Sequence, residues 1–291
     1  QLAELVCEFM ASEGSSPTVE EIQMTAGSQM GLDLATKLFV NPGDVILAEG
    51  PTYTGALGTF EGYQADVRQV LIDQDGLRPD AVREAVEAIR AEGKEVKFLY
   101  TIPNFQNPTG VTLADDRRQE LTRVCRELDV LIVEDNPYGQ LSFDGSRHPS
   151  LHSFDPENVL YLGSFSKVFS PGVRVGWMVA PERVRKFLQI AGEAVTICPS
   201  VLSQRLVLGF MAEGMWQPHT ERTAALYKQR CKAVIAACEK YMPEGTTWTT
   251  PEGGFFTWLT LPEGGKYEDA ADALAPAIEN GVVFVPGSAF Y

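Results

Sequence analysis

The chain has 291 residues, of which 44% are hydrophobic, and a formal net charge of −15. This length allows one large domain or two ordinary ones, with a sizeable hydrophobic core. The negative charge argues against binding to nucleic acid or to an anionic membrane surface. No apolar run reaches the length of a membrane-spanning helix, and no signal peptide is visible.

The five cysteines are odd in number and include no Cys-x-x-Cys pair. We therefore expect five reduced thiols in a cytoplasmic protein. The three histidines are too scattered along the chain to suggest a zinc site, so we expect no metal.

Strand-like and helix-like segments alternate along the first two thirds of the chain. We predict strands at residues 22–25, 45–48, 67–72, 96–102, 130–133, 159–162 and 173–179. Between them we predict helices at 30–39 and 80–91, a loop and helix at 51–62, and a helix that ends near residue 128. Thr112-Leu113-Ala114-Asp115 resembles a capping box for this last helix, with Asp in place of Glu. The alternation predicts an α/β fold with a mainly parallel sheet between helices.

Helical patterns dominate from residue 181 to residue 242. They are followed by a predicted strand at 255–259, a helix at 269–279 and a strand at 282–285. We place a domain boundary near Thr220, which gives a large domain at 1–219 and a smaller α+β domain at 220–291. An amphipathic helical pattern is already under way at Gln1, and the chain stops in apolar sequence. We therefore expect a chain truncated at both ends, without its N-terminal arm and with an incomplete small domain.

A lysine lies between hydroxyl groups and a fixed cation. The run Gly163-Ser164-Phe165-Ser166-Lys167 follows a predicted buried strand, and Arg174 comes seven residues later. A lone Ser-x-Ser-Lys run is usually a surface loop. In this context the lysine is suited to form an imine with pyridoxal phosphate, because the hydroxyls and the arginine can then hold the phosphate.

Other polar residues follow predicted strands, where functional groups of parallel sheets gather. Asn107 follows the strand at 96–102, Asp135 follows 130–133, and Ser28 with Gln29 follows 22–25. A carboxylate beside a pyridine nitrogen raises the pKa of that nitrogen, and a helix N-terminus binds phosphate. On their own, Asp135 is equally a helix cap or an ion-pair partner, and Asn107-Pro108-Thr109-Gly110 is a good turn sequence.

Taken together, the motifs resemble those of a class I/II aminotransferase of the fold-type I pyridoxal-phosphate enzymes, in order and in spacing. They are Gly27-Ser28-Gln29, Pro51-Thr52-Tyr53, Asn107-Pro108-Thr109-Gly110, Asp135-Asn136-Pro137-Tyr138, Ser164-Phe165-Ser166-Lys167 and Arg174. The resemblance covers essentially the whole chain. Residues 27–33 and 103–110 are similar to the 2-aminoadipate/aromatic branch, which also includes aminotransferase-like domains of bacterial transcription regulators.

The resemblance implies a role for each motif residue. Lys167 would carry the Schiff base and move the proton between Cα and C4′, and Asp135 would pair with the pyridinium. Tyr138 and Asn107 would bind the phenolic oxygen of the cofactor, and Asn107 would also touch the substrate carboxylate. Tyr53 would stack on the ring. The residues implied at the phosphate are Ser28, Gln29, Ser164, Ser166 and Arg174, and Gln29 would act either through its side chain or through its backbone amide alone.

The resemblance further implies a homodimer that moves an amino group between an amino acid and a 2-oxo acid. Two alternatives stay open on the same scaffold: a cofactor-binding sensor domain of a transcription regulator, and a lyase or decarboxylase. The family's arginine for the substrate α-carboxylate would lie beyond residues 285–291, so only the cofactor half of the site is complete. Residues 251–255 are either an ordinary hairpin turn or a turn that faces the substrate.

Overall fold

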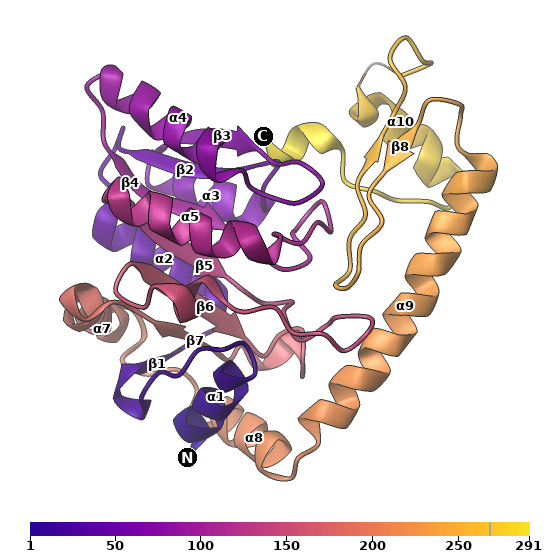
Figure 1. Cartoon of the computed structure of the whole chain (residues 1–291). Coiled ribbons are helices and arrows are strands. Elements are labelled where there is room, and N and C mark those ends of the chain that lie inside the picture. Colours follow the sequence, from indigo (N-terminus) through magenta and orange to yellow (C-terminus); the bar gives the residue numbers. More distant parts are fainter. Residues whose placement is uncertain (268) are drawn as a thin grey trace.

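The computed structural model describes residues 1–267 and 269–291, and a seven-stranded sheet forms its centre (Figure 1). The strand order is β1-β7-β6-β5-β4-β2-β3. The strands are β1 (Ile22–Thr25), β2 (Val45–Gly50), β3 (Asp66–Leu71), β4 (Val96–Thr101), β5 (Leu131–Asp135), β6 (Val159–Ser164) and β7 (Gly176–Val179). Only β7 runs against its neighbours, which confirms the predicted mainly parallel sheet.

Helices cover both faces of the sheet. One face carries α2 (Ser28–Phe39), α3 (Thr54–Gly62) and α7 (Glu182–Thr196), and the other carries α4 (Pro79–Ala91), α5 (Asp115–Glu127) and α6 (Leu151–Phe154). Alternate side chains of a strand point to opposite faces, so Phe98 and Tyr100 of β4 pack with α2 and α3, whereas Leu99 packs with α4 and α5. Burial on both faces explains why the predicted strands are nearly continuous apolar runs.

A third apolar cluster packs against the sheet at β6 and β7. Helices α1 (Leu2–Ala11) and α8 (Val201–Ala212) pack there around Trp177. The Trp177 ring contacts Phe9 at 5.5 Å and Phe165 at 4.9 Å between ring centroids, and its Nε1 donates a hydrogen bond to Met10 Sδ at 3.2 Å. Since Gly163 is the register partner of Trp177, the indole lies directly over a residue that has no side chain.

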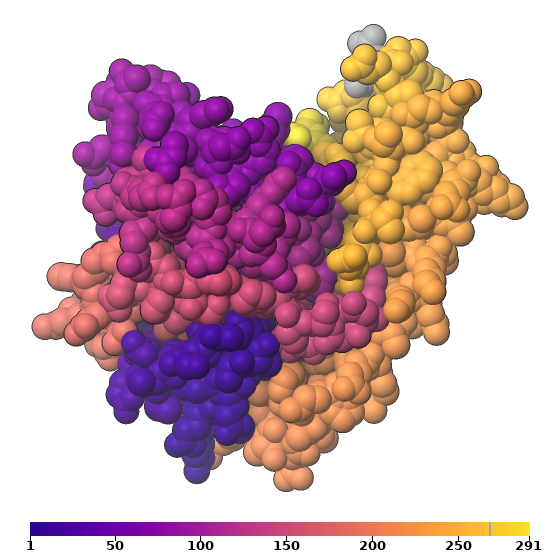
Figure 2. Space-filling model, viewed as in Figure 1, coloured from indigo at the N-terminus to yellow at the C-terminus, as the bar shows by residue number. Residues whose placement is uncertain are grey.

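The C-terminal segment stands beside this body (Figures 1 and 2). It consists of α9 (Trp216–Tyr241), the two-stranded sheet of β8 (Thr247–Trp248) and β9 (Leu259–Thr260), and α10 (Ala270–Glu279). The described residues also include three short 3₁₀ helices: η1 (Val19–Glu21), η2 (Pro171–Val173) and η3 (Gly287–Phe290). Helix α9 runs without a break through residue 220, and the domain division at 219/220 stays a prediction.

Two predicted strands of the C-terminal segment are wrong or nearly so. Only residue 259 of the predicted strand at 255–259 is in a strand, and residues 282–285 are irregular. In the first case the aromatic side chains serve a different contact: Phe255 and Phe256 pack edge-on against Tyr138 at 5.8 and 5.7 Å. Periodicity detects apolar residues but does not identify the surface that they cover.

The ends of two other elements also differ from prediction. Helix α5 has no capping box: its N-cap is Ala114, and Thr112 Oγ1 instead accepts a hydrogen bond from the Phe105 amide at 3.3 Å. Strand β7 begins at Gly176 instead of residue 173, because η2 precedes it and Arg174 has left-handed backbone angles (φ 49°). Both differences arise in loops that turn toward the carboxyl edge of the sheet.

In the described part of the chain, no individual helix has the length and apolar character needed to cross a bilayer. Helices α7 and α8 meet that criterion only as a pair, across a bend of 118°.

Substitution of Gly163 tests the packing of Trp177 of β7 against β6. A Cβ at this position would overlap the buried Trp177 ring, so we expect Gly163→Ala to lower the free energy of unfolding by about 1–3 kcal/mol in urea. Gly58→Ala is the matched control: nothing lies within 4 Å of a Cβ there, and alanine favours the helix, so it should be neutral or stabilising. Equal stability of the two variants would contradict this account of Trp177 packing.

Candidate active site

The loops that follow β1, β2, β4, β5 and β6 meet at the carboxyl edge of the sheet, where the sequence predicts one pocket. Lys167 Nζ lies 5.9 Å from the centre of the Tyr138 ring and 6.0 Å from that of Phe255. The charges of Asp135 and Arg174 both act on Lys167 and on the Tyr53 hydroxyl. Residues from at least four loops therefore face one another, as parallel strands require.

Asp135 ends β5 and is the most informative side chain of the pocket. Its Oδ2 accepts a hydrogen bond from the Tyr100 hydroxyl at 2.9 Å, while its Oδ1 is buried without a partner among the described residues. Burial raises the pKa of Asp135 to about 6, and Tyr100, the charge of Lys167 and the Ser28 hydroxyl oppose this shift. A buried oxygen without a donor is costly, so it fits a ligand that brings an N–H group.

Lys167 brings a primary amine into the pocket. It follows β6 and is held in partly buried surroundings, which lower the pKa of its ammonium group. The positive charge of Arg174 lowers this pKa further, whereas Asp135 raises it. A lowered pKa increases the fraction of neutral amine, which is the form that attacks a carbonyl carbon.

Several groups suited to an anion gather at the N-terminus of α2. The helix begins at Ser28, and the preceding Gly27 has a φ of +85°. A Cβ on Gly27 would approach Arg174 Nη2 to 2.5 Å, so only glycine lets the guanidinium come this close. Arg174 also donates to Ser166 Oγ at 3.3 Å. The free amides of the helix end, the hydroxyl and the guanidinium together suit a phosphate.

Ser164 and Gln29 contribute to this site in different ways. Ser164 Oγ accepts a hydrogen bond from the Ser166 amide at 3.1 Å and so shapes the turn before Lys167. The Gln29 side chain turns away toward α3, where Nε2 donates to Gly55 O at 3.2 Å and to Thr59 Oγ1 at 2.7 Å. A contact of Gln29 with an anion therefore rests on its backbone amide.

Three side chains form the walls. Tyr53 is the N-cap residue of α3, and its ring lies over Gly55, where a Cβ would overlap it. Tyr138 is 4% exposed, and burial raises the pKa of its hydroxyl, whereas the nearby Asn107 lowers it. Asn107 is also buried. Tyr138 and Asn107 can therefore present polar groups to a ligand from positions that are shielded from water.

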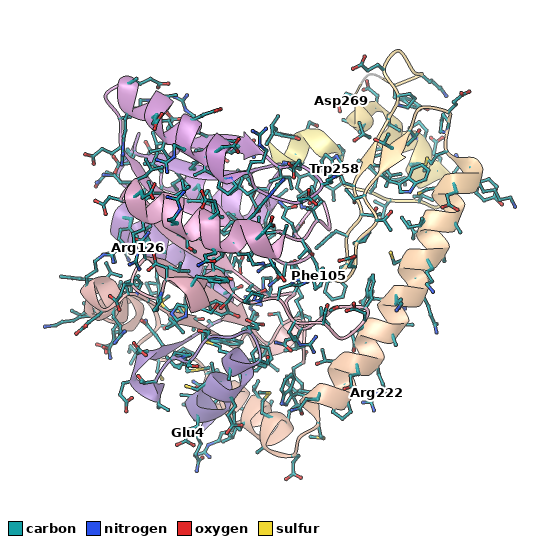
Figure 3. All side chains as sticks on the ribbon, viewed as in Figure 1. Glu4, Phe105, Arg126, Arg222, Trp258 and Asp269 are labelled. Atoms are coloured by element: carbon teal, nitrogen blue, oxygen red, sulfur yellow. The ribbon has the colours of Figure 1, made fainter. Side chains whose placement is uncertain are left out.

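The sequence did not reveal the role of Tyr100, and it left two interpretations of residues 251–255 open. Tyr100 belongs to a strand that reads as a core strand, and only its hydroxyl at the strand end signals a polar role. The turn at 251–255 contacts the loop after Tyr138: the Gly254 amide donates to Leu141 O at 3.1 Å, and the Phe143 amide donates to Glu252 O at 2.8 Å. Figure 3 shows Phe105 beside this turn, where a Cβ on Gly253 would come within 2.5 Å of its ring.

The family model for aminotransferase class I and II matches residues 1–291. The chain belongs to this family. It is 42% identical over 273 residues to aromatic-amino-acid aminotransferase 1 of Thermococcus litoralis, covering 93% of this chain and 64% of the relative. It is 34% identical to the 2-aminoadipate transaminase of Thermus thermophilus, covering 99% of this chain and 74% of the relative. The chain thus spans 64% to 74% of the length of these two relatives.

Solved structures of the family have the same fold. The crystal structure of Pyrococcus horikoshii kynurenine aminotransferase, in complex with PMP, superposes with a TM-score of 0.93 at 38% identity and covers 100% of this chain and 71% of that one. This confirms the predicted fold type I architecture. The branch to which the sequence is similar is also confirmed, since the relatives include aromatic and 2-aminoadipate enzymes.

Buried ionisable groups predict how the stability of this family member depends on pH. Burial raises the pKa of Glu49 and Glu134 to about 7 and that of Asp135 to about 6, and lowers that of His152 to about 4. Between about pH 5 and pH 6 the three folded carboxyls hold protons that the unfolded chain releases, whereas folded His152 lacks one that the unfolded chain binds. The folded state therefore binds more protons in this range.

It follows that stability falls as pH rises. The slope is on the order of 1 kcal/mol per pH unit for each net proton. In urea, without added ligand, we expect a larger free energy of unfolding near pH 5 than near pH 7. Glu134→Gln should flatten this dependence because it removes one of the three carboxyls. A free energy of unfolding that rises with pH across this range would contradict the assignment.

Proposed function

We propose that the chain is the cofactor-binding part of an aminotransferase that uses pyridoxal phosphate to move an amino group between an amino acid and a 2-oxo acid. The observation that carries the proposal is the unpartnered, buried Oδ1 of Asp135 in a pocket with Lys167. Relatives named as aminotransferases, and the solved relative in complex with PMP, support it.

The residues of the pocket suit the groups of this cofactor. When bound, pyridoxal phosphate supplies an aldehyde that condenses with amines and a ring that accepts an electron pair. Lys167 Nζ would hold the cofactor at its aldehyde carbon and, once freed by an amino acid, would move the proton between the amino acid Cα and C4′. Asp135 Oδ1 would accept a hydrogen bond from the ring N–H and, through its negative charge, keep that proton in place.

The remaining residues bind and orient. The α2 amides at Ser28 and Gln29, with Ser166 and Arg174, would hold the phosphate, and Ser164 supports the turn that carries Ser166 and Lys167. Tyr53 would stack on the ring. Asn107 and Tyr138 would bind the phenolic oxygen, and Asn107 would also bind the substrate carboxylate. The low exposure of Asn107 and Tyr138 excludes water and strengthens these contacts.

We also propose that the protein acts as a homodimer in the cytoplasm and that its domains divide near residue 220. Large apolar side chains of α7, α8 and the turn between them are exposed, which suits a subunit interface. They are Phe187, Ile190, Val195, Ile197, Val201, Leu202 and Leu206. The five cysteines are free thiols, which suits a reducing compartment. The sensor-domain alternative is not favoured: the Thermococcus litoralis aminotransferase is 42% identical to this chain, whereas the transcriptional regulators YisV and YdfD of Bacillus subtilis are each 31% identical.

The test of the proposal is a half-reaction assay. The full-length protein is loaded with pyridoxal phosphate and mixed with a panel of amino acids, and the 2-oxo acids formed are identified. Aromatic amino acids and 2-aminoadipate belong in the panel because relatives are named for them. Formation of pyruvate with ammonia from serine would instead indicate elimination. Bound cofactor without 2-oxo acid from any amino acid would sink the proposal.

We predict that Lys167→Ala abolishes turnover, by about 10³-fold or more, and removes the visible absorbance of the covalently held cofactor. The alanine can neither bind the aldehyde carbon nor move the proton. The matched control is Lys186→Ala, which removes an exposed lysine of α7 and should behave like the parent. An unchanged spectrum in Lys167→Ala would show that another group binds the cofactor.

We predict that Asp135→Asn still binds the cofactor but slows the half-reaction by about 10²-fold or more, because the neutral amide no longer keeps the ring nitrogen protonated. Asp155→Asn is a matched control: this buried aspartate pairs with Arg126 (Oδ2 to Nε, 2.7 Å), so the variant should lose stability but keep its rate. Stopped-flow traces of the half-reaction decide between the two. Parent-like rates in Asp135→Asn would refute its role.

A further inference from the structure

A buried carboxylate lies beneath the pocket and contacts neither the anion site nor Asp135. Glu49, near the end of β2, is 3% exposed. Its Oε1 accepts a hydrogen bond from Thr101 Oγ1 at 2.6 Å, and its Oε2 accepts from the Ile102 amide at 3.1 Å and from Gln106 Nε2 at 3.2 Å. These three donors are neutral, so no positive charge offsets the cost of burying this acidic group.

Gln106 connects this carboxylate to two loops. Besides Glu49, its Nε2 donates to Pro51 O at 2.7 Å. Its Oε1 accepts from the Thr109 amide at 2.9 Å and from Thr109 Oγ1 at 2.6 Å. The side-chain amide thus makes all four hydrogen bonds that it can make, and the residue is 2% exposed. No polar atom of the Gln106 side chain is left for a substrate.

These bonds fix the backbone on both sides of the pocket. Pro51 lies two residues before Tyr53, and Gln106 directly precedes Asn107. The loop is closed further by the Gly110 amide, which donates to Gln106 O at 2.6 Å. One buried side chain thereby joins the loop that carries Tyr53 to the loop that carries Asn107.

We propose that Glu49 and Gln106 are positioning residues, which set the places of Tyr53 and Asn107 through the backbones of these two loops. Neither touches the reacting atoms. The inference rests on the proposed function for its consequence in the reaction, but the geometry of the two loops can be tested without it.

The neighbouring strand provides a matched control. Glu134 on β5 is likewise fully buried, and it lies beside Thr101 in the sheet register. Its oxygens accept hydrogen bonds from the Leu151 and His152 amides at 3.0 and 2.9 Å, so it supports α6 instead of the pocket loops. Glu134→Gln places an amide N–H against a backbone N–H and should destabilise the protein without freeing either loop.

The test uses three variants of Glu49 and Gln106. Gln106→Leu and Glu49→Leu keep the approximate volume and remove the bonds. Glu49→Gln should rescue the geometry: its Oε1 can accept from Ile102 and Gln106, while its Nε2 donates to Thr101 Oγ1. Gln106→Leu decides the outcome if Glu49→Leu does not fold.

The first measurement is hydrogen exchange by mass spectrometry on the protein without added ligand. In Gln106→Leu and Glu49→Leu, the amides of residues 106–111 should exchange about tenfold faster or more, relative to those of β5 and β6. Glu49→Gln and Glu134→Gln should leave this ratio unchanged. Parent-like exchange in Gln106→Leu, or equally fast exchange in Glu134→Gln, would overturn the proposal.

The second measurement is made on the protein loaded with pyridoxal phosphate. The dissociation constant of the cofactor and KM should rise about tenfold in Gln106→Leu, and the induced circular dichroism of the bound ring should change, whereas Glu49→Gln stays near the parent. A parent protein that does not bind the cofactor would sink the proposed function, while the exchange data would still test the positioning. Faster exchange with an unchanged dissociation constant, KM and dichroism would overturn the link to Tyr53 and Asn107.

Discussion

The burial of the Asp135 carboxylate at the end of a central strand is the constraint on which the site depends. The carboxyl group lies on β5, between β4 and β6. Strand β4 provides the Tyr100 hydroxyl, which donates a hydrogen bond to Oδ2, and the loop after β6 provides the positive charge of Lys167. Oδ1 stays unpartnered among the described residues. A carboxyl with one oxygen satisfied and one open binds a positively charged N–H donor much better than a neutral one.

Burial also bears on how a chain with a net charge of −15 would hold the phosphate of the proposed cofactor. Exposed negative charges act over about one Debye length and are screened by salt, whereas the anion site is made of groups at contact distance. The α2 N-terminus and Arg174 supply these groups locally. Several acidic side chains lie inside the sheet, where burial favours their protonated forms and weakens their repulsion of a phosphate.

Local chemistry was enough to predict the seven strands of the main sheet and the loops that carry the candidate site, because strands buried on both faces read as apolar runs and polar residues follow them. It failed where a side chain serves a distant partner. Phe255 and Phe256 read as strand residues but cover Tyr138. Thr112 reads as a helix cap but accepts a hydrogen bond from the Phe105 amide. Each partner becomes adjacent only after folding.

The loop that carries Asn107 makes hydrogen bonds both to the main sheet region and to the C-terminal segment, so it connects these two parts of the molecule. The amide and the hydroxyl of Thr109 both donate hydrogen bonds to Gln106 Oε1. The Thr109 carbonyl accepts a hydrogen bond from Thr249 Oγ1 of the C-terminal segment at 2.5 Å. The turn at residues 251–255 bonds the loop after Tyr138 in the same region. A shift of the C-terminal segment must therefore move the Asn107 loop or break this partly buried hydrogen bond, which contributes about 0.5–1.5 kcal/mol. The interior of the main sheet, through Glu49 and Gln106, thus resists a displacement that begins in the C-terminal segment.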